Sequence, residues 1–219
     1  MIPLQQKLFI TFIIILGLYY TFFYETISPS LVMVFKLLPM ILIILLAILT
    51  KAENVNSYKI SVLFALIFCA FGDYTLQWFI IGLVCFLIGH LFYIRAFLKT
   101  DETKAPFLFT VCLSLYGAIM IIWIGWSLIQ GSNIILAMAV FTYIIVILIM
   151  GWSSFRTGSK FAIFGALLFI VSDSILAINK FMFPVDYSHQ LIMLTYYGAQ
   201  ILMALSIPKY SAIRSEVIQ

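Results

Sequence analysis

Residues 31–50, LVMVFKLLPMILIILLAILT, are the stretch that decides the fold. Lys36 is the one charged residue in it. The hydrocarbon core of a bilayer is about 30 Å thick, and a helix that rises about 1.5 Å per residue crosses it with about 20 apolar residues. The stretch is therefore long enough and apolar enough to cross a membrane as one helix.

The rest of the chain has the same character. Of its 219 residues, 65% are hydrophobic and 9% are charged, whereas an ordinary soluble domain is about half apolar and about one quarter charged. This composition excludes a water-soluble globule, a disordered chain and a coiled coil. Only helices and closed barrels satisfy their backbone groups in lipid, and the apolar runs show no two-residue alternation, so helices are expected. The sequence predicts an all-α integral membrane bundle of eight transmembrane helices in one domain, residues 1–219, with spans at about 7–24, 31–50, 59–77, 80–98, 106–127, 133–152, 160–179 and 189–208.

The basic residues are distributed unevenly between the predicted loops. If the N-terminus is cytoplasmic, ten of the twelve Lys and Arg residues fall in cytoplasmic segments, while Lys180 lies on the other side and Lys36 within a span. Positive charge concentrates on the cytoplasmic side of membrane proteins, so both termini are predicted to be cytoplasmic. The predicted location of the protein is the inner membrane of a bacterium. These loops account for the net charge of +4, and nucleic acid is not expected as a partner. The ten residues are Lys7, Lys51, Lys59, Arg95, Lys99, Lys104, Arg156, Lys160, Lys209 and Arg214.

Two segments 100 residues apart suggest an internal duplication. Residues 68–76 (FCAFGDYTL) align with 168–176 (LFIVSDSIL), and the match places a small residue followed by Asp, and then a Leu, at the same positions. Four predicted spans separate the copies, so they would run in the same direction, as parallel repeats do. The alternative is chance similarity between two apolar helices.

Four residues that can carry a charge, Lys36, Asp73, His90 and Asp173, lie well inside predicted spans and away from the basic residues at the span ends. An ionisable group at the centre of a bilayer costs at least about 2.5 kcal/mol, so it usually faces the bundle interior and has a function. The predicted topology puts Lys36, Asp73 and Asp173 at similar depth in the non-cytoplasmic half, with His90 deeper, which suggests one site open to the outer side. The structural alternative is a buried ion pair that fixes helix packing.

The last span adds two polar candidates, Tyr196 and Gln200. Residues four apart share one face of a helix, so both side chains are expected to point the same way. Aromatic residues in membrane helices also serve as packing or interface anchors, and that alternative stays open for Tyr196.

Two carboxyls in a dry pocket favour acid–base chemistry. Burial favours the neutral acid, so one Asp is suited to donate a proton while the other, held ionised by Lys36, acts as a base. Metal catalysis is less well supported, because the chain has two histidines and no pair at ligand spacing, and no cofactor is expected. A proton-coupled small-solute transporter and a metal-dependent membrane lipid hydrolase remain alternatives.

Five motifs in order resemble the YhhN-like lysoplasmalogenases, a family of small multi-spanning membrane proteins. They are KLLPM at 36–40, FGD at 71–73, FLIGHLFYI at 86–94, GALLFIVSDS at 165–174 and YYGAQ at 196–200. The resemblance covers spans two to eight. It implies an eight-helix fold, a lysophospholipid substrate in the bilayer, and hydrolysis of the vinyl ether bond of a lysoplasmalogen to a fatty aldehyde and glycerophosphocholine or glycerophosphoethanolamine.

The resemblance also implies the site residues. The family's polar positions correspond here to Lys36, Asp73, His90 and Asp173, and further to Tyr196 and Gln200. We expect Asp173 to be the acid, because no Lys is predicted near it, and Asp73 to be the base beside Lys36. Lys36 could instead bind the lipid phosphate as a point charge, with Tyr196 and Gln200 as further substrate contacts, and His90 is expected to orient a carboxylate or relay a proton.

Overall fold

The computed structural model describes residues 4–50, 57–100, 103–131 and 134–208, and within these ranges it contains helices and no strand. Each apolar run forms one helix, and the tight connections carry short 3-10 turns at Tyr24–Thr26 and Phe155–Thr157. The helices are α1 (Leu4–Phe23), α2 (Pro29–Leu49), α3 (Ser57–Thr75), α4 (Phe79–Leu98), α5 (Phe107–Gln130), α6 (Ile134–Ser154), α7 (Lys160–Phe181) and α8 (Ser188–Leu205).

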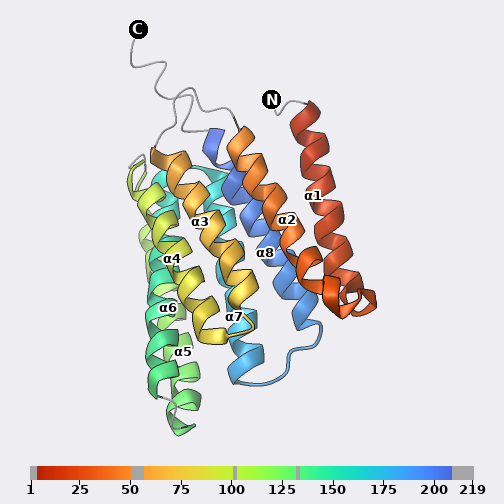
Figure 1. Cartoon of the computed structure of the whole chain (residues 1–219). Coiled ribbons are helices and arrows are strands. Elements are labelled where there is room, and N and C mark those ends of the chain that lie inside the picture. Colours follow the sequence, from red (N-terminus) through yellow and green to blue (C-terminus); the bar gives the residue numbers. More distant parts are fainter. Residues whose placement is uncertain (1–3, 51–56, 101–102, 132–133, 209–219) are drawn as a thin grey trace.

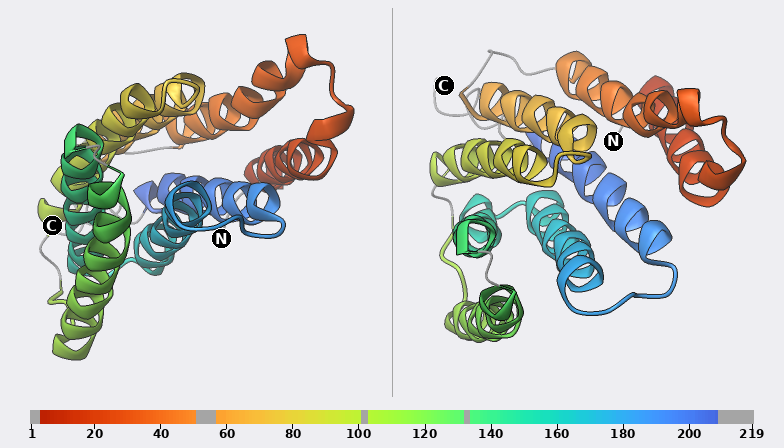
Figure 2. Two further views of the ribbon diagram at one scale, coloured as in Figure 1. Left: turned by 90° about the horizontal axis from the view of Figure 1, so that it is seen from below. Right: turned by 60° about the horizontal axis from the view of Figure 1, so that its bottom comes forward.

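The helices run up and down in one bundle, and the beginning of α1 and the end of α8 lie at the same end of it (Figure 1). The most extensive packing is between neighbours in the chain, α3 with α4 and α7 with α8. Helix α6 joins α4 to α5 and α7, while α8 also contacts α1, α2 and α3. Figure 2 shows α5 at one side of the bundle and α1 at the opposite side.

Seven of the eight described helices are long and apolar enough to cross a membrane. The exception is α8, which is present as predicted but is more polar because it carries His189, Gln190, Tyr196 and Gln200. It needs less apolar surface, since α1, α2, α3 and α7 all contact it.

Three parts of the topology prediction stay predictions. The structure contains no membrane and does not test which end of the bundle is cytoplasmic. Lys51, Lys209 and Arg214 in the charge count, and Asn133 at the start of the sixth predicted span, lie outside the described residues. The duplication of 68–76 at 168–176 is also untested.

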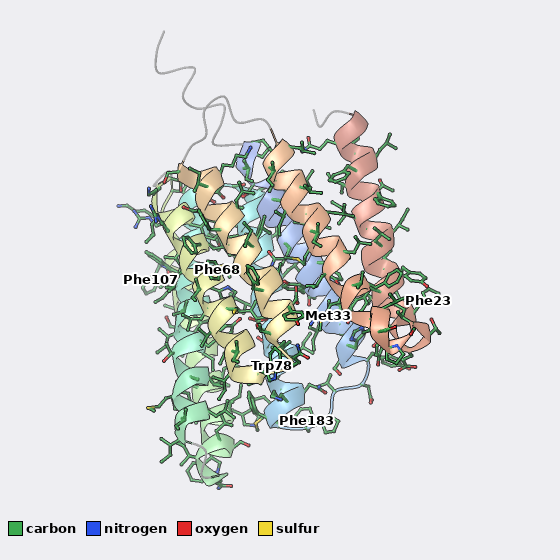
Figure 3. All side chains as sticks on the ribbon, viewed as in Figure 1. Phe23, Met33, Phe68, Trp78, Phe107 and Phe183 are labelled. Carbon is green, nitrogen blue, oxygen red and sulfur yellow. The ribbon has the colours of Figure 1, made fainter. Side chains whose placement is uncertain are left out.

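Large apolar side chains cover the outside of the bundle (Figure 3). Phe107 is 84% exposed, and Phe23 and Trp78 project outward from other helices with about half of their surface free. Soluble monomers rarely carry extended apolar surface of this kind. This surface is that of an integral membrane protein whose neighbours are lipid chains.

Glycines allow α3 and α4, the helices that carry Asp73 and His90, to pack close together. A Cβ atom on Gly82 would lie 2.7 Å from the Cα of Leu76, and one on Gly89 would lie 2.9 Å from the Sγ of Cys69. Such small residues let membrane helices approach closely in the absence of a hydrophobic driving force. The α3–α4 contact therefore depends on the missing side chain at Gly89, and the turn between the two helices depends on the missing side chain at Gly82.

Gly82→Ala is expected to destabilise the bundle, because the added methyl meets the backbone of Leu76 in the tight turn that joins α3 to α4. Overpacking of this kind costs about 1–3 kcal/mol. The measurement is the thermal unfolding midpoint of purified protein in detergent. Gly131→Ala is the matched control, since a Cβ there meets nothing closer than 3.5 Å; equal midpoints for the two variants would contradict the close-approach argument.

Candidate functional site

The predicted intramembrane residues gather in two polar clusters. The first, named here the Asp73 cluster, consists of Lys36, Asp73, Tyr196 and Tyr197. The Lys36 ammonium lies 3.7 Å from Oδ1 of Asp73 and also donates to the Asp73 backbone oxygen at 2.9 Å. Tyr196 donates its hydroxyl hydrogen to Oδ2 of the same carboxylate at 2.6 Å. The Asp73 carboxyl is thus held by α2 on one oxygen and by α8 on the other.

The helix ends explain why Lys36 lies there. Asp73 is near the end of α3, where the last backbone carbonyls lack partners inside the helix. A lysine ammonium satisfies such a carbonyl and is favoured by the helix dipole. Tyr197 adds a link by donating to the Lys36 backbone oxygen at 2.7 Å. The cluster therefore ties α2, α3 and α8 together.

The second, the Asp173 cluster, consists of Asp173, Tyr143 and His90, from α7, α6 and α4. The Tyr143 hydroxyl donates to Oδ2 of Asp173 and lies 3.2 Å from Nε2 of His90. His90 Nε2 is 3.7 Å from the same carboxylate oxygen. Because a tyrosine hydroxyl has one hydrogen, which Asp173 accepts, Nε2 of His90 must carry the hydrogen that completes its contact with Tyr143. The three residues form one hydrogen-bonded chain.

Two phenylalanines connect the clusters and are named here the aromatic bridge: Phe86 of α4 and Phe169 of α7. The Phe169 ring lies 4.6 Å from the His90 ring and 5.5 Å from the Tyr196 ring, edge-on to both. Phe86 contacts Phe169 and Tyr196 at 6.3 Å and 6.0 Å. The two clusters are therefore joined by packed aromatic rings.

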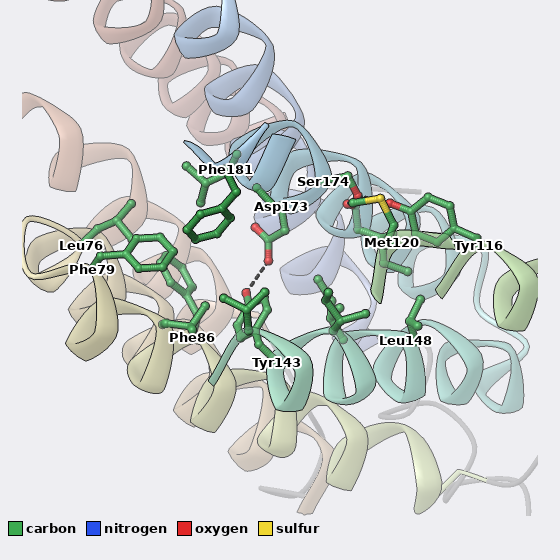
Figure 4. A pocket seen from close by; sticks show the side chains of 17 residues that line it. Leu76, Phe79, Phe86, Tyr116, Met120, Tyr143, Leu148, Asp173, Ser174 and Phe181 are labelled. Atoms are coloured by element: carbon green, nitrogen blue, oxygen red, sulfur yellow. Dashed lines mark hydrogen bonds between the residues drawn. The ribbon is translucent and has the colours of Figure 1, made fainter. Parts of the chain in front are cut away.

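An apolar pocket opens beside the Asp173 cluster (Figure 4). It contains about 660 Å³ of space, counting the part open to the outside, and lies mainly between α4, α5, α6 and α7. Four polar residues meet in its wall: Tyr143 with Asp173, and Tyr116 hydrogen-bonded to Ser174. The apolar lining consists of Leu76, Phe79, Leu83, Phe86, Met120, Val140, Ile144, Ile147, Leu148, Ile170, Leu176, Ala177 and Phe181.

The Asp173 carboxyl is suited to act on a ligand in this pocket. Its side chain is 16% exposed, whereas that of Asp73 is 4% exposed. Tyr143 occupies Oδ2, and in the described part of the chain no hydrogen bond goes to Oδ1. A carboxyl with one oxygen fixed and the other free at the wall of an apolar pocket can exchange a proton with a mostly apolar substrate.

The structure places the other predicted residues away from this pocket. Lys36, Asp73 and Tyr196 form their own cluster, and Gln200 is fully buried, where it accepts a hydrogen bond from Tyr93 at 2.7 Å. None of these residues lines the pocket. Across the described ranges, no three His, Cys, Asp or Glu side chains gather as a metal site would require.

Sequence reasoning missed the tyrosine that orders the Asp173 cluster. Tyr143 lies in a long apolar run, and an uncharged tyrosine there gives no signal that separates it from a packing residue. Ser174 also lines the pocket, and its position beside Asp173 in the sequence did not predict this, because consecutive residues point in different directions around a helix.

The fold and the clusters define an integral membrane protein with ionisable residues buried between its helices. The YhhN family model matches residues 31–207, which includes α3 to α8 in full and all of α2 except its first two residues. The chain therefore belongs to the YhhN family, as the five motifs indicated, and α1 lies outside the match. No solved structure matches this chain.

Curated relatives carry the name lysoplasmalogenase. The chain is 38% identical over 166 residues to "Lysoplasmalogenase TMEM86A" of Homo sapiens, a match that covers 64% of this chain and 62% of the human protein. It is 31% identical over 168 residues to "Lysoplasmalogenase TMEM86B" of Sus scrofa, with 74% of this chain and 70% of that protein covered. The match to the rat TMEM86B protein is 29% identical and covers 93% of this chain. The chain spans less than two thirds of the human TMEM86A protein.

Proposed function

We propose that this protein hydrolyses the vinyl ether bond of a lysoplasmalogen within the membrane. The products are a fatty aldehyde and a glycerophospho-alcohol such as glycerophosphoethanolamine or glycerophosphocholine. The observation that carries the proposal is the Asp173 carboxyl, fixed by Tyr143 in the wall of an apolar pocket. Family membership and the name lysoplasmalogenase carried by the relatives support the same reaction.

The first step is protonation of carbon. The protonated Asp173 carboxyl gives its proton to the outer carbon of the double bond, and the ether oxygen shares a lone pair to form an oxocarbenium ion. The carboxylate that remains lies beside this cation and stabilises it. The Tyr143 hydrogen bond holds Oδ2 in place and leaves Oδ1 to carry the proton that goes to the substrate.

Water completes the reaction. It adds to the carbon of the oxocarbenium ion and loses a proton to the Asp173 carboxylate, which restores the acid. The resulting hemiacetal transfers its hydroxyl proton to the glycerol oxygen and breaks the bond between that oxygen and the former vinyl carbon. One water is consumed, and one aldehyde and one alcohol are formed. His90 holds Tyr143 in place through Nε2.

Asp73 has a positioning role in this proposal. The sequence-based assignment of Asp73 as the base and Lys36 as a phosphate ligand stays a prediction. Our alternative rests on the pocket lining, which includes Phe86 but not Asp73, and on Lys36, whose ammonium already contacts Asp73 twice. The Asp73 cluster then fixes Tyr196 against Phe86, the residue of the aromatic bridge that lines the pocket.

We further propose that both termini face the cytoplasm. The beginning of α1 and the end of α8 share one end of the bundle, and Lys99 and Lys160 lie at helix ends on that side (Figure 1). The end of α7 with Lys180 lies at the opposite, non-cytoplasmic end. Asp173, about two turns before it, would then act in the non-cytoplasmic half.

The test is aldehyde release by purified protein in detergent. A 1-alkenyl glycerophosphoethanolamine is expected to yield fatty aldehyde, whereas the saturated 1-alkyl analogue, which has no double bond to protonate, yields none. A transporter needs two compartments and would release nothing in detergent. No aldehyde above the rate without protein, with folded wild-type protein, would refute the proposed activity.

A further inference from the structure

A second charged residue lies on the pocket side of α7. Lys180 follows Asp173 by seven residues, which places both on one face of the helix, about 10 Å apart along its axis. Leu176 and Ala177, which lie between them on that face, line the pocket. The pocket wall therefore extends along α7 from Asp173 toward Lys180, which lies near the end of the bundle.

Contacts place the Lys180 ammonium at that end of the pocket. It lies 4.5 Å from the centre of the Phe79 ring, over its face. Phe79 and Phe181 both line the pocket and pack edge-to-face at 5.5 Å. Figure 4 shows Phe79 and Phe181 on the same side of the pocket, beyond Asp173 when viewed from Tyr116.

The Lys180 ammonium is available for an anion. The residue is exposed, and in the described ranges no carboxylate lies within 4.0 Å of its ammonium. Lys36, a second lysine in this half of the bundle, differs in both respects, because its side chain is 14% exposed and Asp73 holds it. The stacking on Phe79 fixes the direction of the Lys180 charge without neutralising it.

We propose that Lys180 binds the phosphate of the lysophospholipid and so sets which bond lies beside Asp173; this inference rests on the proposed function. In a lysoplasmalogen, seven bonds join the outer vinyl carbon to phosphorus, a reach of roughly 9 Å when single bonds measure about 1.5 Å. That length is close to the backbone rise of about 10 Å between Asp173 and Lys180 along α7. A phosphate at Lys180 puts the vinyl ether at Asp173 and the hydrocarbon chain deeper, toward Ile147 and Leu148.

The arrangement also determines selectivity. Lysine acts as a point charge on the phosphate, so choline and ethanolamine lipids should be accepted alike, whereas a vinyl ether without phosphate should lose affinity. The alternative is that the Lys180 charge only stabilises the C-terminal end of α7 through the helix dipole. Removing it would then lower protein stability but would affect both substrates equally.

The test compares two substrates across three variants. Lys180→Met keeps the apolar stem and removes the charge, Lys180→Arg keeps the charge, and Lys160→Met is the matched control at the other end of the same helix. For a 1-alkenyl glycerophosphoethanolamine we expect Lys180→Met to raise KM about tenfold, a change of about 1.4 kcal/mol, with kcat nearly unchanged. For a 1-alkenylglycerol, which has no phosphate, KM should stay the same. Lys180→Arg and Lys160→Met should resemble the wild type.

Equal changes on both substrates, or none on either, would overturn the phosphate assignment. Failure of the proposed function is a separate result, because the wild type would then release no aldehyde from either vinyl ether. In that case, binding of a saturated 1-alkyl glycerophosphocholine to wild type and Lys180→Met tests the lysine alone. Weaker binding by the variant supports a phosphate site at Lys180, and equal binding refutes it.

Discussion

Asp173→Asn is expected to lower kcat for a vinyl ether lysolipid by about 10²–10⁴-fold, the range that a positioned general acid contributes. The amide has the size of the carboxyl and can accept the Tyr143 hydrogen bond through its oxygen, but it has no proton to give to carbon. The measurement is aldehyde release by purified protein in detergent, with binding of the saturated 1-alkyl analogue as a check that the pocket is intact.

Asp73→Asn is the matched control, since it makes the same change in the other intramembrane aspartate. We expect it to retain much more activity per folded molecule, because Asp73 is not in the pocket wall and acts through Tyr196 and the aromatic bridge. If Asp73→Asn abolished aldehyde release while Asp173→Asn kept it, the two aspartates would have the reverse roles.

Lys36→Met is expected to cause a large loss of stability. It removes the cation from a carboxylate that is 4% exposed and also removes the hydrogen bond to the Asp73 backbone oxygen. Removing one partner of a buried ion pair typically costs about 3–5 kcal/mol, because the remaining charge is left without compensation. The measurement is the unfolding midpoint in detergent, which should fall further than for Gly82→Ala.

The double variant Lys36→Met with Asp73→Asn should recover much of that loss. With the carboxylate gone, no buried charge lacks a partner, and the Asn side chain can still accept from Tyr196. Residues in contact give non-additive effects of this kind. If the stability losses of Lys36→Met and Asp73→Asn simply added in the double variant, the ion pair would not be what holds α2 to α3.

Much of the fold could be predicted because lipid imposes a simple length rule on apolar runs. The predicted spans 31–50 and 160–179 correspond to α2 (Pro29–Leu49) and α7 (Lys160–Phe181). The remaining differences lie at helix ends, where hydropathy changes over several residues. The polarity of α8 shows where the length rule is weakest, since neighbouring helices rather than lipid surround such a segment.

The sequence could predict which charged residues belong to the candidate site but not how their side chains are arranged. Depth along the membrane follows from sequence position, so Lys36, Asp73 and Asp173 could be placed in the same half. Which way a side chain points around an almost wholly apolar helix has no comparable signal. For this reason the residues expected in a single site lie in two clusters, with His90 beside Asp173. The sequence also gave no indication of Tyr143, which lies between His90 and Asp173.

The most direct test of the central claim is a structure of the protein with a saturated 1-alkyl glycerophosphocholine bound. We predict its ether linkage beside the Asp173 carboxyl, its chain in the pocket between α4, α5, α6 and α7, and its phosphate at Lys180. An ether linkage beside Asp73 and Lys36, on the other side of the aromatic bridge, or a lipid held only in the groove that α1 and α8 form around Gly17 and Leu194, would contradict the account.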